Sequence, residues 1–234
     1  MTVIETKNRK TTENGIDFQS MIPSPASDRE VELYEMKRME GLERQRRTRL
    51  LEHYRSDDSG VGMKFWDMEL SDFMADTPER KSALEAVKRF IAKPGNRIML
   101  FCGSYGTGKT MLESLCVREL GGCYITAFRL CTEFASGSDF KSKRSKLQVL
   151  DFYGRRLPFL AIDELEDAVD VLVLRNIVME RYENGLPTAL ATNMGKADTV
   201  KFLGAKMFDR LNEVCTSLEM GWESYRRKLR KELL

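Results

Sequence analysis

A glycine-rich segment carries the most specific chemical signal in this sequence. Residues 103–110 read Gly-Ser-Tyr-Gly-Thr-Gly-Lys-Thr and match the pattern G-x-x-x-x-G-K-T. A largely apolar run at 97–102 precedes it, and a helix-patterned segment at 111–120 follows it. Glycines at this spacing let backbone N–H groups turn inward around phosphates, and the next helix adds the positive end of its dipole. The sequence therefore predicts a nucleoside triphosphate site between a strand and a helix.

Each residue of this phosphate loop has an expected role. Lys109 is expected to reach the β- and γ-phosphates, and the Thr110 hydroxyl to ligate Mg²⁺. The predicted nucleotide-binding residues are Gly103, Ser104, Tyr105, Gly106, Thr107, Gly108, Lys109, Thr110 and Met111. A glycine-rich turn that binds no ligand is the alternative, and the position between a strand and a helix argues against it.

Two acids follow a second apolar run downstream. Residues 157–162 are apolar and lead directly into Asp163 and Glu164. Such a run fits a strand buried on both faces, whose carboxyl end opens at the crevice where α/β sheets bind ligands. We expect Asp163 to join the Mg²⁺ shell and Glu164 to polarise the attacking water. A strand-end acid pair that is merely solvated is the alternative, and the upstream phosphate loop favours the catalytic interpretation.

Two further side chains could complete an ATPase site. Asn193 ends another short apolar run, 188–192, where its amide could hydrogen-bond the γ-phosphate and the lytic water. Asparagine is also a common turn former at strand ends. Arg210 falls where an arginine could reach the γ-phosphate of a neighbouring subunit, and a surface arginine without that role fits the spacing equally well.

The composition excludes several other kinds of chemistry. Net charge is +2 with 32% charged residues and a mean hydropathy of −0.41, so nucleic-acid contacts must come from local patches. Five cysteines without a C-x-x-C pair argue against a zinc site or a disulfide framework and favour a reducing cytosol. The one histidine, His53, is expected at the surface, which excludes histidine-based catalysis. We expect a cytoplasmic protein, because no secretory leader or membrane span is evident.

The sequence divides into three regions. Residues 1–26 are polar and read as a disordered tail. Residues 27–59 start with capping-box spacing at 27–30 and predict a charged helical region for partner binding. A solvated helix is an equally good interpretation of its narrow apolar stripe. Residues 60–234 form the predicted ATPase domain.

The motifs together resemble a known family. They are residues 103–110, 160–164, Asn193, the box Phe208-Asp-Arg-Leu211 and the ending Trp222-Glu-Ser-Tyr-Arg226. This set resembles the DnaC-type replicative helicase loaders, within the DnaC/IstB group of AAA+ ATPases. The resemblance implies an α/β fold: a P-loop NTPase of the AAA+ type, a three-layer sandwich with a five-stranded parallel sheet. A helical N-terminal region would precede this domain. We expect no separate helical lid domain, because only 14 residues follow Met220.

The resemblance also implies ATP with Mg²⁺ and a role for each motif residue. Lys109 and Thr110 match the Walker A positions, Asp163 and Glu164 match Walker B, and Asn193 matches sensor 1. Arg210 matches the arginine finger and Arg226 matches sensor 2. The catalytic residues that it implies are thus Glu164, Asn193, Arg210 and Arg226, and the metal ligands are Thr110 and Asp163.

Two positions depart from the family pattern. Glu166 stands where the family usually has glycine shortly after the Walker B acids. Lys206 stands where loaders often carry a second arginine near the finger, which keeps the charge but loses bidentate geometry.

Loaders of this kind hold a replicative DNA helicase through their N-terminal region, assemble through their ATP sites and bind single-stranded DNA. The family's DNA segment falls on Lys141, Lys143, Arg144 and Lys146, with Phe140 as a stacking face. A solvated lysine-rich loop explains these residues equally well. The resemblance places the protein in a bacterial cytoplasm, with a cellular or a phage gene.

Other functions remain open at this stage. An IstB-type transposition helper would share the same catalytic core. A nucleotide-regulated adaptor with little turnover would fit the departures at Glu166 and Lys206. A small-molecule kinase is a weaker alternative, because it needs neither the Asn193 sensor nor an arginine acting in trans.

Overall fold

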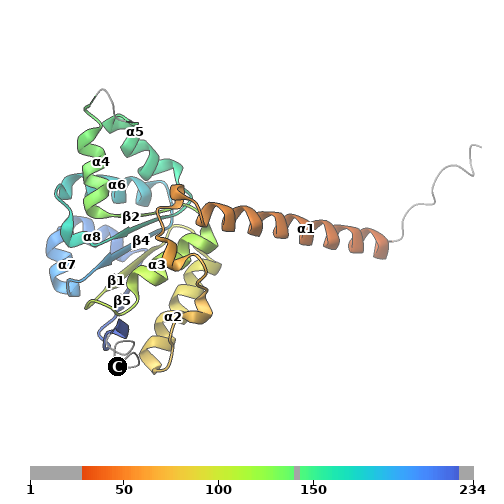
Figure 1. The fold of residues 1–234 in the computed structure, drawn as a ribbon. Helices are drawn as coiled ribbons and strands as arrows, with labels where there is room; N and C mark the ends of the chain where they lie inside the picture. Colours follow the sequence, from red (N-terminus) through yellow and green to blue (C-terminus); the bar gives the residue numbers. More distant parts are fainter. Residues whose placement is uncertain (1–27, 140–142, 227–234) are drawn as a thin grey trace, which may run out of the picture. The chain divides into compact units, whose positions relative to one another are not determined.

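Five short segments of the chain pair into one parallel sheet (Figure 1). They are β1 (Ile98–Cys102), β2 (Cys123–Thr126), β3 (Leu160–Asp163), β4 (Thr188–Thr192) and β5 (Cys215–Glu219), in the order β2-β3-β4-β1-β5. All four pairings are parallel. Every residue of β1, β3 and β4 is buried, as expected for central strands covered on both faces. The predicted five-stranded parallel sheet is confirmed.

The computed structural model describes residues 28–139 and 143–226. It divides into two units, with the boundary between Arg46 and Arg47. The sheet and the helices that cover it belong to the second unit. This boundary lies upstream of residue 60, where we expected the ATPase domain to begin, and the assignment of residues 27–59 to partner binding stays a prediction.

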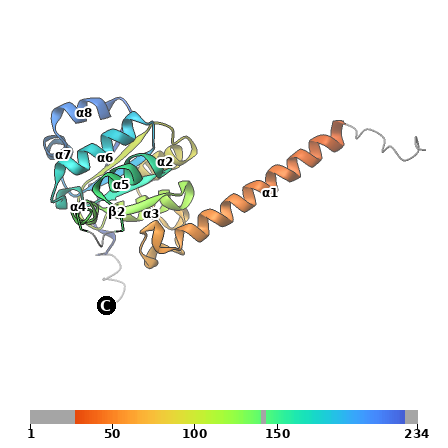
Figure 2. The ribbon, with the colours of Figure 1, turned by 90° about the horizontal axis from the view of Figure 1, so that it is seen from above.

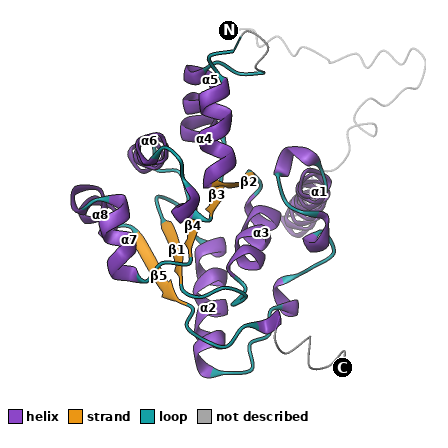
Figure 3. Cartoon of the chain, turned by 60° about the vertical axis from the view of Figure 1, so that its left-hand side comes forward, coloured by secondary structure: helices purple, strands orange, loops and turns teal. Residues whose placement is uncertain are grey.

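Helices cover the sheet in two layers, and alternate strand residues point into each layer (Figure 3). On one face, Met99 and Phe101 of β1 pack with α2 (Pro78–Ala92) and α3 (Lys109–Leu120). On the other, Ile98 and Leu100 pack with the remaining helices. Those helices are α4 (Ala127–Ser136), α5 (Lys146–Asp151), η4 (Phe152–Arg156), α6 (Val171–Glu183), α7 (Lys196–Leu203) and α8 (Ala205–Asn212). The result is the three-layer α/β sandwich that we expected.

Local sequence signals set where these helices begin. The Thr77 hydroxyl accepts a hydrogen bond from the backbone N–H of Arg80, and Pro78 occupies the first turn of α2. Asp170 caps α6 in the same way, accepting from the backbone of Leu172 and Val173. These caps fix where α2 and α6 begin.

The N-terminal helix α1 (Asp28–Tyr54) is one continuous helix of 27 residues (Figure 2). Its capping box cannot be placed, because Ser27 lies outside the described residues. The apolar residues of its first half are all exposed; they are Val31, Leu33, Tyr34, Met36, Met39 and Leu42. Near its end, His53 is only partly exposed, and its Nε2 lies 2.5 Å from the carbonyl oxygen of Gly122. The expectation of a surface histidine was therefore wrong, because His53 packs on the turn before β2.

Several short 3-10 turns connect α1 to α2. They are η1 (Asp57–Ser59), η2 (Met63–Phe65) and η3 (Leu70–Asp72). After β5 the described chain runs only from Met220 to Arg226, so no helical lid follows the sheet within the described residues. None of the described helices is long and apolar enough to span a bilayer.

Candidate nucleotide-binding site

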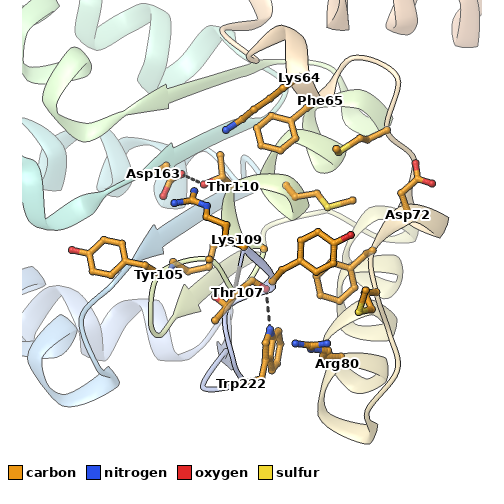
Figure 4. Close-up of a pocket in the computed structure, with 18 of the residues that line it drawn as sticks. Lys64, Phe65, Asp72, Arg80, Tyr105, Thr107, Lys109, Thr110, Asp163 and Trp222 are labelled. Carbon is orange, nitrogen blue, oxygen red and sulfur yellow. Dashed lines mark hydrogen bonds between the residues drawn. The ribbon is translucent and has the colours of Figure 1, made fainter. Parts of the chain in front are cut away.

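A cavity of about 320 Å³ lies at the carboxyl ends of the strands, beside the phosphate loop (Figure 4). Residues 105–111 of the loop and of the first turn of α3 line it. Asp163 and Glu164 after β3, and Asn193 after β4, line the same cavity. The topology of the sheet thus brings together the three motifs that we predicted from separate parts of the sequence.

The phosphate loop needs its glycines for conformation and for space. Gly103, Gly106 and Gly108 have φ angles of 133°, 76° and 101°, which residues other than glycine rarely adopt. A Cβ on Gly103 would lie 2.4 Å from the carbonyl oxygen of Met220. Gly108 caps the N-terminus of α3, so the loop leads into the positive end of that helix. This geometry is the one that the predicted phosphate-binding role requires, and that role stays a prediction.

Lys109 is buried at the base of the loop, with 6% of its surface exposed. Its Nζ donates hydrogen bonds to the carbonyl oxygens of Gly103 (2.7 Å) and Ser104 (2.9 Å) and to Oδ1 of Asn193 (2.8 Å). Burial lowers the pKa of this lysine, and the nearby acids Asp163 and Glu166 partly oppose that shift. Lys109 thus joins the phosphate loop to the end of β4 by a direct hydrogen bond, a contact that the sequence did not predict.

Asp163 is held by three donors. The Thr110 hydroxyl donates to Asp163 Oδ2 at 2.6 Å, and the Glu164 backbone N–H donates to Oδ1 at 2.8 Å. The hydroxyl of Tyr124 on β2 also donates to Oδ2, at 2.9 Å. Burial, followed by the charge of Asp163, raises the pKa of Tyr124, so this hydroxyl keeps its proton. Nothing in the sequence around Tyr124 marks it as part of the site.

The residues present fit a magnesium ion that is shared with a nucleotide. Thr110 and Asp163 offer a hydroxyl and a carboxylate, the oxygen ligands that Mg²⁺ prefers. Among the described residues no cluster of three or more acids, histidines or cysteines could hold a metal alone. This agrees with the usual Mg²⁺ arrangement, in which one or two protein groups are joined by substrate phosphates and water.

Glu164 faces the cavity from an unusual backbone conformation. Its φ of 56° makes it the one described non-glycine residue with positive φ. Residues in this region cost conformational energy and cluster at functional sites. Burial, and then the charges of Asp163, Asp167 and Glu166, raise the pKa of Glu164. A carboxylate of raised pKa is a stronger base, which suits the predicted role toward water.

Arg226 also lines the cavity, because the segment after β5 returns to the phosphate loop. Trp222 Nε1 donates to the carbonyl oxygen of Thr107 at 2.9 Å, and the Tyr225 backbone N–H donates to that of Gly106 at 2.9 Å. The predicted sensor 2 arginine therefore shares the cavity with the Walker residues.

Arg210 lies elsewhere in the domain. It is half exposed on α8, where its guanidinium is 4.0 Å from Glu183 Oε1. It does not line the cavity of its own chain. A residue that acts on a neighbouring subunit must lie outside its own chain's site, as Arg210 does. The arginine-finger role of Arg210 stays a prediction.

Apolar side chains complete the cavity. Phe65, Met68, Phe73 and Met74 come from the connection between α1 and α2. They face the cavity together with Trp222, whose ring meets Phe73 edge-on at 6.4 Å. An apolar wall beside a phosphate cradle suits a heteroaromatic base.

The basic segment before α5 is only partly described. Phe140 and Lys141 lie outside the described residues. Arg144 pairs with Glu133 at 2.8 Å and stacks 3.9 Å from the Phe152 ring centre, and Lys146 lies 5.3 Å from that of Phe134. Lys143 is exposed. Intrachain contacts thus occupy part of the predicted DNA-binding charge.

No family model matches the chain. It is 24% identical over 183 residues to the replicative helicase loader DnaC of Escherichia coli strain K12. This match covers 73% of the chain and 74% of that relative. The chain is similar to the DnaC-type helicase loaders. This match confirms the resemblance to helicase loaders that we inferred from the motifs.

Solved structures support the fold of the DnaC-like chain. DnaI is 21% identical with a TM-score of 0.55, and the match covers 72% of the chain and 99% of DnaI. AMPPCP-bound DnaA from Aquifex aeolicus is 17% identical with a TM-score of 0.56, and the match covers 74% of the chain and 56% of that DnaA. The DnaC-like chain thus spans about half of the DnaA chain. At these identities the likeness shows the fold, which is the three-layer α/β sandwich with a parallel sheet described above.

Proposed function

We propose that this protein is an ATP-hydrolysing helicase loader that acts in DNA replication. The observation that carries the proposal is the joining of Lys109, Thr110, Asp163 and Asn193 by hydrogen bonds around one cavity. The similarity to DnaC supports the loader assignment, and the likeness to AMPPCP-bound DnaA supports ATP as the nucleotide.

In the proposed reaction the phosphate loop binds the triphosphate through its backbone N–H groups and the N-terminus of α3. Lys109 exchanges its present acceptors for the β- and γ-phosphates. Glu164 accepts a proton from water, whose oxygen bonds to the γ-phosphorus while the bond to the bridging β–γ oxygen breaks. ADP and phosphate are the products. Mg²⁺, held by Thr110 and Asp163, would neutralise charge on the phosphates.

Two arginines complete the proposed mechanism. Arg226, in the cavity, would contact the phosphates of its own chain. Arg210, on α8, would contact the γ-phosphate bound by a neighbouring copy, so that self-association completes the site. The energy of hydrolysis would then be available only in an assembly.

The proposed partners are a replicative helicase and single-stranded DNA. The exposed apolar residues of α1, including Met36 and Met39, would bind the helicase. The exposed Lys143 and its basic neighbours would contact the DNA backbone. We place this activity in a bacterial cytoplasm.

ATP hydrolysis by the purified full chain, with and without single-stranded DNA, tests the enzymatic part. We expect Glu164→Gln to bind ATP and to lose hydrolysis, since it keeps the shape of the side chain but not the base. Lys109→Ala should lose binding. If the wild type is no faster than Glu164→Gln under every condition, the protein is instead a nucleotide-regulated adaptor.

A further inference from the structure

Glu166 is bonded to the sensor strand at three points. The Thr192 hydroxyl donates to its Oε2 at 2.7 Å, and the backbone N–H of Asn193 lies 3.2 Å from both carboxylate oxygens. The side-chain Nδ2 of Asn193 donates to Glu166 Oε1. Burial alone would raise the pKa of Glu166, but these donors outweigh it and the pKa is lowered. Glu166 is therefore a carboxylate that accepts from every group it contacts here.

The amide of Asn193 is fixed from both sides. A carboxylate lies against its nitrogen, and the ammonium group of Lys109 lies 2.8 Å from its oxygen. Turning the amide over would place oxygen against oxygen at Glu166 and nitrogen against nitrogen at Lys109. Both flanking charges therefore select one orientation, with the amide oxygen toward the cavity.

We propose that Glu166 is a positioning residue that fixes the Asn193 amide so that its oxygen acts in the ATPase site as a hydrogen-bond acceptor. Once Lys109 donates to the phosphates, Asn193 Oδ1 is free to accept one O–H of the attacking water. Glu164 accepts the other, so the oxygen lone pair of the water is directed at the γ-phosphorus. This inference rests on the proposed ATP hydrolysis. It gives a role to Glu166, which stands where the family usually has glycine.

Single substitutions test the positioning role. Glu166→Ala frees the amide, so kcat should fall by roughly 10- to 100-fold, the size of effect that follows from misplacing a catalytic group. The Kd for ATP should not change, because Glu166 does not line the cavity. Asp198→Asn, which removes an exposed charge that pairs with Lys201 on α7, is the control and should keep the wild-type kcat.

A reciprocal exchange gives the sharper test. Asn193→Asp alone places a second carboxylate against Glu166, so kcat should fall. Adding Glu166→Gln in the same chain restores a donor–acceptor pair, because the new amide can donate to the new carboxylate while still accepting from Thr192. The double variant should recover at least tenfold in kcat over Asn193→Asp, a recovery that general loss of packing would not give. Wild-type kcat in Glu166→Ala, or a double variant no faster than Asn193→Asp, would overturn the inference.

A measurement without turnover separates this inference from the proposed function. Thermal unfolding of the wild type, Asn193→Asp, Glu166→Gln and the double variant should show a lower Tm for Asn193→Asp and recovery in the double variant. If the wild type hydrolyses no ATP but this recovery is seen, the pairing stands and the proposed activity fails. If the changes in Tm caused by Asn193→Asp and by Glu166→Gln simply add in the double variant, the pairing itself is wrong.

Discussion

The indole nitrogen of Trp222 donates a hydrogen bond to the carbonyl oxygen of Thr107 at 2.9 Å, which joins the segment after β5 to the phosphate loop. Ser224 packs so closely on the same loop that a Cβ on Gly106 would lie 2.1 Å from its Oγ. Arg80 of α2 adds a hydrogen bond to the Glu223 carbonyl oxygen at 3.1 Å. The conformation of the loop thus depends on residues more than a hundred positions away in the sequence.

Trp222→Phe should weaken nucleotide binding. It keeps the aromatic packing on Phe73 but removes the hydrogen bond to Thr107, which contributes about 1 kcal/mol. We expect the Kd for ATP, measured by calorimetry, to rise about fivefold. Trp66→Phe is the matched control, since Trp66 bonds to Val61 away from the loop. Equal Kd values for Trp222→Phe and wild type would show that the loop holds its conformation unaided.

Glu113 should make stability fall as pH rises. It is fully buried on α3, and neither carboxyl oxygen has a hydrogen-bond partner among the described residues. Burial, and then the charge of Asp163, raise its pKa well above 4.5. Above about pH 4.5 the unfolded chain has released this proton while the folded chain keeps it, so stability decreases up to the folded pKa.

Glu113→Gln should remove this dependence. We expect urea unfolding of the metal-free chain to show that the free energy of unfolding of Glu113→Gln, relative to that of the wild type, increases as pH rises. The steepest expected gain is about 1.4 kcal/mol per pH unit. Glu119→Gln on the same helix is the control. A difference between Glu113→Gln and wild type that does not change with pH would mean that Glu113 is ionised when folded.

Arg181 should be a major contributor to stability. It is fully buried on α6, and burial lowers its pKa to about 10. Its guanidinium donates to the Thr188 hydroxyl and to the carbonyl oxygens of Tyr153, Leu157 and Pro187, at 2.8 to 3.2 Å. These bonds tie η4 and the start of β4 to α6.

Arg181→Lys keeps the charge but cannot reach all four acceptors. We expect the free energy of unfolding in urea to fall by about 2–4 kcal/mol, since each buried acceptor left without a donor costs about 1–3 kcal/mol. Arg155→Lys, at an exposed pair with Glu180, should leave stability unchanged. A similar stability for Arg181→Lys and wild type would mean that water replaces the lost donors.

The part of the site that lies in short linear motifs could be predicted from the sequence. Lys109, Thr110 and Asp163 were recognisable because spacing along the chain fixes their chemistry. Tyr124 and Glu166 were not, because their roles depend on which strands become neighbours: β2 beside β3, and β4 beside the turn that follows β3. Arg181 was missed for a similar reason, since its partners are mostly backbone carbonyl oxygens that no sequence pattern marks.

Arg210→Ala should separate binding from hydrolysis. ATP binding should be kept, because Arg210 lies outside the cavity of its own chain, whereas stimulated hydrolysis should be lost. Arginine fingers contribute roughly 10³–10⁵ in rate. Lys201→Ala, at an exposed pair with Asp198, is the control and should be as active as wild type.

Mixing Arg210→Ala with Lys109→Ala should restore hydrolysis. A chain with an intact Lys109 would then bind ATP beside a neighbour with an intact Arg210. Activity in the mixture no higher than the sum of the two separate variants would rule out a shared site.

On the proposed function, ATP bound in this cavity controls a partnership with a replicative helicase. The most direct test of that control is the co-purification of the full chain with the helicase of its own replication system, with ATP, with ADP and without nucleotide. We predict a complex that forms with nucleotide present and whose yield differs between ATP and ADP, and we expect Lys109→Ala to remove that difference. The absence of a complex with either nucleotide would contradict the loader assignment.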